Sequence, residues 1–173
     1  MLPLTRRTAL VLAGSSLLAP LLLATDAMAE PADGTAEGTL TVNGKTTKVA
    51  YAYARSVPGF FDKSTQDTQI IVSDVPLEPT ALVDGFIRSD MAKAGKLHAF
   101  EITLDAAGQP ISTAWRHDGF DGPMPSGLSS ADVFVKSALD DKVVAGSYKS
   151  AEEEEFFGNT YAFDVTFRAA IAH

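Results

Sequence analysis

Apolar and polar residues alternate with a period of two along most of the chain after residue 38, which predicts β-strands with one buried face. The clearest run covers residues 160–171, where every second side chain is apolar and Asp164, Thr166 and Arg168 lie between them. Two more alternating runs, 39–42 and 46–54, flank Asn43-Gly44. Both turn residues tolerate a positive φ, so this pattern predicts a β-hairpin with a type I′ turn.

Other segments extend the same pattern. Residues 68–73 are apolar on both faces, as in a central, covered strand. A second hairpin is expected from 96–104 and 111–117, with a turn at 106–110. A strand is expected at 143–148, and 133–139 fits either a strand or a short turn of helix. Residues 56–66 and 118–130 are rich in Gly and Pro or lack periodicity, so they are predicted to be loops.

The only helical spacing covers residues 79–94. Pro79 suits a first helical turn and Gly95 suits the C-terminal cap. The side chains expected to share the apolar face are Leu82, Val83, Phe86, Ile87, Met91 and Ala94. Seven or eight short strands with one helix predict a mainly β fold, an antiparallel β-sandwich formed by residues 38–173.

The first 29 residues have the pattern of a signal peptide. Arg6 and Arg7 precede an uncharged apolar run at 9–24, and Ala27-Met28-Ala29 fits cleavage before Glu30. The run is shorter than the roughly 20 residues of a spanning helix, so no membrane anchor is expected after cleavage. The segment 5–10 resembles a twin-arginine signal without its usual aromatic residue, and ordinary Sec export stays open.

The predicted mature chain is acidic. Cleavage would leave 144 residues with a net charge of −9, against −8 for the full 173 residues. Clustered Lys and Arg are needed to neutralise phosphates, so nucleic acid is not an expected partner. Cysteine is absent, so an exported protein of this sequence would depend on its core for stability. Residues 30–37 follow no period and are predicted to be a flexible leader before the domain.

Catalytic motifs are missing from the sequence. It has no Gly-x-Ser-x-Gly elbow and only three histidines, without paired metal-ligand spacing, so no catalytic residue, cofactor or metal is predicted. His117, Asp118 and Asp121 could wrap a hard cation such as Ca²⁺, but Asp and Gly in this loop are also ordinary turn formers. The candidate binding residues are Phe60, Phe61, Trp115, His117, Asp118, Phe120 and Asp121.

Three segments together resemble a loose group of exported bacterial β-rich proteins without an assigned activity. They are Leu40–Lys45 continuing into Ala50–Ala52, Ile71–Leu77 and Phe163–Phe167. The resemblance implies a β-sandwich and export to the periplasm or the medium, and it transfers no catalytic residue. We therefore expect a non-enzymatic binding or interaction module, with an envelope protein or a glycan as partner. The alternative is a hydrolase with a metal or an acid pair on the 118–130 loop.

Overall fold

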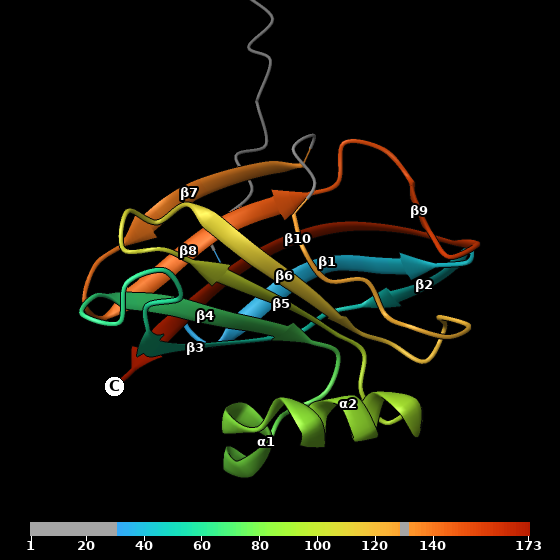
Figure 1. Ribbon diagram of the computed structural model, residues 1–173, viewed down its shortest axis with the longest axis horizontal. Helices are drawn as coiled ribbons and strands as arrows, with labels where there is room; N and C mark the ends of the chain where they lie inside the picture. Colours follow the sequence, from blue (N-terminus) through green and yellow to red (C-terminus); the bar gives the residue numbers. More distant parts are fainter. Residues whose placement is uncertain (1–30, 129–131) are drawn as a thin grey trace, which may run out of the picture.

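A computed structural model describes residues 31–128 and 132–173, so the expected signal peptide lies outside the described residues. The described chain forms ten strands and two short helices (Figure 1). In chain order they are β1 (Thr35–Val42), β2 (Lys45–Lys48), β3 (Tyr51–Pro58), β4 (Gln66–Ser73), α1 (Pro79–Val83), α2 (Gly85–Lys93), β5 (Ala99–Leu104), β6 (Pro110–Arg116), β7 (Val133–Leu139), β8 (Val143–Lys149), β9 (Glu154–Phe156) and β10 (Asn159–Ala172). None of the described helices is long and apolar enough to cross a membrane.

The strands join into one hydrogen-bonded sheet in the order β6-β5-β4-β3-β1-β10-β8-β7, with β2 added to β1 and β9 to β10. Neighbours are antiparallel apart from a short parallel contact between the ends of β10 and β3, where Ile171 pairs with Ala54. The mainly β, antiparallel prediction is confirmed. The strands form a single curled sheet where two separate sheets were expected, because β1 and β3 keep the two halves hydrogen-bonded to each other.

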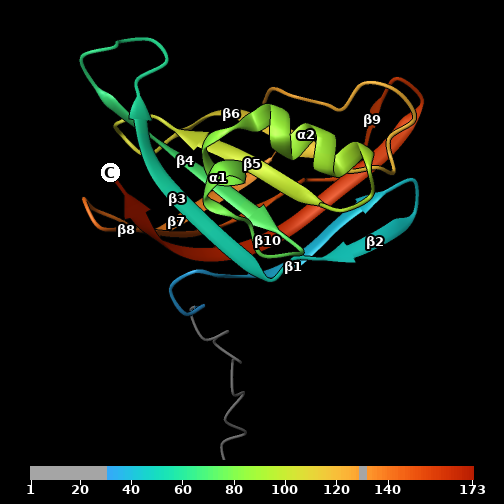
Figure 2. The same cartoon turned by 90° about the horizontal axis from the view of Figure 1, so that it is seen from below.

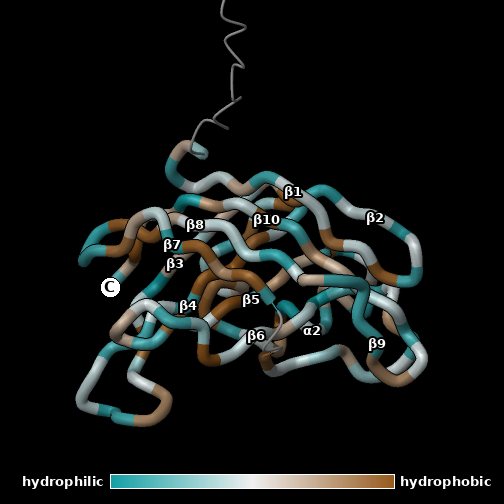
Figure 3. Tube along the Cα trace, turned by 90° about the horizontal axis from the view of Figure 1, so that it is seen from above, coloured by the Kyte–Doolittle hydropathy of each residue, from teal (hydrophilic) through white to brown (hydrophobic). Residues whose placement is uncertain are grey.

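The inner, concave face of this sheet holds the main core. Phe100 on β5 stacks 4.4 Å from Phe163 on β10 and 5.9 Å from Tyr148 on β8, measured between ring centroids. These strands are not neighbours in the sheet, so the contacts between them show that the sheet curls over its own inner face. As predicted, alternate residues of β10 from Tyr161 to Ala169 are buried. Figure 3 shows hydrophobic positions gathered along the central strands.

Helices α1 and α2 cover the outer face of β4 and β5 (Figure 2). The single helix predicted for 79–94 is wrong, because Asp84 interrupts it with φ −113° and ψ 108°. The Asp84 carboxylate accepts bonds from the backbone N–H groups of Phe86 and Ile87, which restarts the helix as α2. The predicted apolar face is confirmed for Leu82 and Met91, which pack against a buried apolar cluster. It is wrong for Phe86, which is 85% exposed, and it omitted Arg88, which is buried.

Arg88 is buried because it binds an acid on the sheet. Its guanidinium donates to both carboxylate oxygens of Glu101, at 2.9 and 2.7 Å, and to the carbonyl of Ala81 at 2.6 Å. Arg116 reaches the same carboxylate at 2.9 Å. Glu101 lies on the outer face of β5, between the inward-facing Phe100 and Ile102, and α2 covers it there. Packing between helix and sheet therefore includes an ionic centre beside its apolar contacts.

The predicted hairpin at Asn43-Gly44 is confirmed, with φ of 49° and 76° at the two turn residues. The prediction of a flexible leader over residues 30–37 is wrong for residues 35–37, because β1 already begins at Thr35. Thr35 pairs with Arg168, and this ladder to β10 continues to Val42. Backbone pairing with the long final strand orders residues 35–37, although their side chains show no alternating pattern.

Candidate functional site

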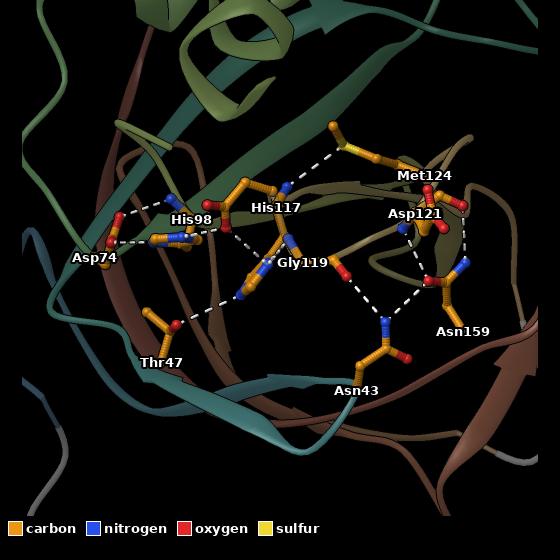
Figure 4. A network of polar contacts seen from close by, with 10 residues as sticks. Asn43, Thr47, Asp74, His98, His117, Gly119, Asp121, Met124 and Asn159 are labelled. Atoms are coloured by element: carbon orange, nitrogen blue, oxygen red, sulfur yellow. Dashed lines mark hydrogen bonds and ion pairs between the residues drawn. The ribbon is translucent and has the colours of Figure 1, made fainter. Parts of the chain in front are cut away.

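Three neighbouring strands end together and bring polar side chains side by side. Ser73 of β4 pairs with Ala99 of β5, and Ala99 pairs with Arg116 of β6. The next position on each strand therefore places Asp74, His98 and His117 next to one another, and the backbone N–H of Asp74 donates to the carbonyl of His98 at 3.0 Å. Figure 4 shows these residues around one point at the end of the sheet.

His98 lies between two carboxylates. Asp74 accepts from the backbone N–H of His98 at 2.8 Å, and its second oxygen lies 2.6 Å from Nδ1 of the same residue. On the other side, Nε2 of His98 lies 2.9 Å from Oδ1 of Asp118. The double contact with Asp74 fixes the plane of the imidazole and directs Nε2 toward Asp118.

His117 is fully buried, and its ring centroid lies 4.3 Å from that of His98. Its Nδ1 accepts from the backbone N–H of Gly119 at 2.9 Å and lies 3.6 Å from Oδ1 of Asp118. Burial lowers the pKa of His117 to about 4, and the charge of His98 acts in the same direction. The ring is therefore neutral near pH 7, with a lone pair on Nδ1.

Asp118 completes the cluster and is its most exposed member, with a third of its side chain accessible. The hydrogen bond from His98 lowers the pKa of this carboxyl, so it is ionised at neutral pH. Donor atoms of His98, His117 and Asp118 all lie within 4.8 Å of one another. Imidazole nitrogens and carboxylate oxygens are ligands that suit Zn²⁺ and related metals.

The donor spacing can be compared with a metal site. Zinc bonds of about 2.0–2.1 Å in a tetrahedron place ligand atoms about 3.3 Å apart. The spacings from Asp118 Oδ1 are 2.9 Å to His98 Nε2 and 3.6 Å to His117 Nδ1, on either side of this value. A small shift of the Asp118 side chain would equalise them. The bond from Gly119 to Nδ1 of His117 would have to lengthen when a metal takes that lone pair.

Two asparagines hold the loop that follows His117. Asn43 donates to the carbonyl of Gly119 at 3.0 Å and to Oδ1 of Asn159 at 2.9 Å (Figure 4). The same oxygen of Asn159 accepts from the backbone N–H of Asp121 at 2.9 Å. The β1–β2 turn and the start of β10 thus fix residues 119–121, and Asp118 enters the cluster from an anchored backbone.

The structure brings together only part of the residue set predicted from the sequence. His117 and Asp118 belong to the cluster. Trp115 and Phe120 are buried in the core and meet edge to face, with centroids 5.5 Å apart. Asp121 is exposed on the loop and takes no part in the cluster of donors.

Phe60 and Phe61 are exposed, as expected, but lie on the β3–β4 loop. That loop precedes β4, whereas Asp74 follows β4, so the two phenylalanines stand at the opposite end of the strand. They cannot share one site with His117.

His98 and Asp74 were missed by the sequence analysis. The observed β5–β6 ladder ends with Ala99 opposite Arg116, so the next pair places His98 opposite His117. Both histidines lie inside the predicted 96–104 and 111–117 hairpin, so its register contained the signal. Asp74 joins the cluster because β4 pairs with β5, although the helical segment separates these strands in sequence. No local sequence pattern indicates that pairing. Comparisons with protein-family models, curated proteins and solved structures gave no match.

A second polar group lies beside Trp115. A cavity of about 110 Å³ is lined by Trp115, Tyr161, Asp132 and Glu154, among others. Burial and the neighbouring Glu154 charge raise the pKa of Asp132 to about 6. Tyr161 donates to Glu154 at 2.9 Å. This acid pair lines the cavity together with residues 125–128 of the 118–130 loop. The cavity volume suits water more than a substrate.

Proposed function

We propose that the protein is an exported, non-enzymatic binding protein that holds one divalent transition-metal ion, with Zn²⁺ as the best fit, at His98, His117 and Asp118. The observation that carries the proposal is the meeting of two imidazoles and a carboxylate at three adjacent strand ends. This differs from the expectation of no metal drawn from the sequence.

The surroundings of the cluster favour a metal over a purely structural hydrogen-bond network. Asp74 orients His98 as outer carboxylates orient metal-bound histidines. The lowered pKa of His117 keeps that ring in the form that binds metals. Without an ion, the two bonds of His98 to carboxylates form together only if both ring nitrogens carry protons, so zinc binding would release a proton from Nε2.

Low exposure of the donors favours holding an ion over processing a substrate. His117 is fully buried and His98 is 14% exposed, which leaves Asp118 as the accessible ligand. A hydrolase would need a substrate cleft beside the metal as well as an open coordination position.

Metal content and affinity test the proposal directly. The chain beginning at Glu30 is stripped with EDTA, reconstituted with Zn²⁺ and titrated calorimetrically, with Co²⁺ absorption as a readout of coordination. We expect one ion per chain, with binding lost in His98→Ala and Asp118→Asn. Asp121→Asn is the matched control, because it removes a carboxylate from the same loop outside the cluster. Unchanged zinc binding in His98→Ala, or no binding by the parent, would contradict the proposal.

Export is tested separately. The mature protein recovered from the periplasm or the medium should begin at Glu30, as read by mass spectrometry. A recovered species that still begins at Met1 or Leu2 would contradict cleavage.

A further inference from the structure

A cavity of about 340 Å³ opens between α1 and the outer face of β3 and β4, away from the metal cluster. Its walls are mainly apolar, from Tyr53, Ile71, Leu82 and Val83, and polar groups of Arg55 and Gln69 stand at its side. Val83 is 62% exposed at the rim. The volume lies at the lower end of small-ligand pockets, which are about 300–1,000 Å³.

Arg55 lines the cavity and lies near the charges of Arg88 and Glu101, although the whole chain is acidic. Arg55, Arg88 and Arg116 lie around one carboxylate, Glu101, which Arg88 and Arg116 both bind. Arg55 binds the side-chain oxygen of Gln69 through Nε at 2.7 Å and forms no ion pair with any described carboxylate. Burial, and then the charge of Arg88, lower the pKa of Arg55, while the charge of Glu101 acts in the opposite direction.

We propose that this cavity binds a single-chain carboxylate amphiphile, a free fatty-acid anion, with its carboxylate on Arg55 and its alkyl chain against Tyr53, Ile71 and Leu82. Two independent features support the assignment. The apolar walls match an alkyl chain, and the distal nitrogens of Arg55 match the planar, bidentate geometry of a carboxylate.

A free amphiphile fits better than a membrane surface. The chain carries a net charge of −8, so an anionic bilayer would repel it at distances beyond the local Arg cluster. The cation is also recessed, because Arg55 is half-buried on the strand below α1. A single chain can enter the cavity and reach it, whereas headgroups in a bilayer plane would meet the exposed side chains of α1 and α2 first.

Binding of dodecanoate tests the proposal, with dodecanol and dodecyltrimethylammonium as neutral and cationic probes. Calorimetry is performed on the mature chain in EDTA, so the outcome is independent of the metal site. We expect dodecanoate to bind at least about tenfold more tightly than dodecanol, a difference of about 1.4 kcal/mol, because a hydrogen bond to a charged group is stronger than one between neutral groups. Dodecyltrimethylammonium should bind least.

Paired variants locate the site. Arg55→Gln should remove the preference for dodecanoate over dodecanol and leave dodecanol binding in place, with Lys149→Gln as the control for loss of a surface cation. Val83→Asp should weaken both probes, whereas Val133→Asp, at a similarly exposed valine on β7, should weaken neither. Equal binding of the anionic and cationic probes, identical effects of the two valine variants, or binding only to anionic vesicles would overturn the proposal.

Discussion

Removing the Glu101 carboxylate should destabilise the protein strongly. In Glu101→Leu, the Arg88 guanidinium stays 2% exposed under α2 and loses its countercharge. It keeps the carbonyls of Ala81 and Leu82, but these do not neutralise a charge. Breaking one partner of a buried pair costs about 3–5 kcal/mol. That is a large share of the roughly 5–15 kcal/mol of a typical domain.

A double-mutant cycle separates the pair from simple packing. Arg88→Met alone leaves Glu101 bound to Arg116, whose side chain is 19% exposed and can hydrate, so its cost should be smaller. Arg88→Met combined with Glu101→Leu removes both buried charges and should recover most of the loss, because replacing a buried pair with apolar side chains is often neutral or favourable.

Urea unfolding followed by far-UV circular dichroism gives the free energy of unfolding for the parent and all three variants. The slope with urea must stay the same across the set for the comparison to hold. If Glu101→Leu unfolds at the parent's urea concentration, or the double variant is no more stable than Glu101→Leu, the buried ionic centre does not exist as described.

Three more changes test other parts of the structure. Phe167→Ala should lower the free energy of unfolding in urea by about 3–5 kcal/mol, whereas Phe157→Ala, at an exposed residue, should lower it by almost nothing. Equal effects would mean that the buried face assigned to β10 is wrong. The raised pKa of Asp132 stabilises the fold while the group is protonated, so this contribution is present below pH 4 and lost as pH rises through about 6. Relative to Asp132→Asn, the parent should therefore lose about 1–2 kcal/mol between pH 4 and 7, after allowance for partial exposure; parallel stability curves would refute this. Asn159→Ala should cost about 1–3 kcal/mol and raise amide exchange at residues 119–121; unchanged exchange would mean that the loop does not depend on Asn159.

Local signals in the sequence predicted the strands well. Asn43-Gly44 specifies its turn because both residues tolerate a positive φ. The alternation from Tyr161 to Ala169 predicts a strand with one buried face, without information about its neighbours. The prediction of a single helix was wrong because it considered only the spacing of apolar residues and not the capping role of Asp84. Arg88 could not be assigned to the buried side, because its partner Glu101 lies on a strand that folds beneath it.

Only part of the candidate site could be predicted from the sequence, because its other residues come from distant strands. His117 and Asp118 are adjacent in sequence, so the sequence alone indicates them as a pair of candidate ligands. His98 joins them through the register of the β5–β6 hairpin, and Asp74 joins them through the β4–β5 pairing. Asn159 comes from the far end of the chain, and no spacing connects it to Asp121. Pairing between distant strands sets these contacts, and a pattern of side-chain types carries little information about such pairing.

The position of β10 has a consequence for how the fold is assembled. The strand pairs with β1 on one side and β8 on the other, so the first strand of the domain has its longest ladder with the last. A chain still lacking residues 159–172 leaves β1 without that partner and the aromatic core without Phe163 and Phe167. Loop closure over more than a hundred residues slows such pairing. We therefore expect cooperative folding only once residues 159–172 are available to pair with β1 and β8.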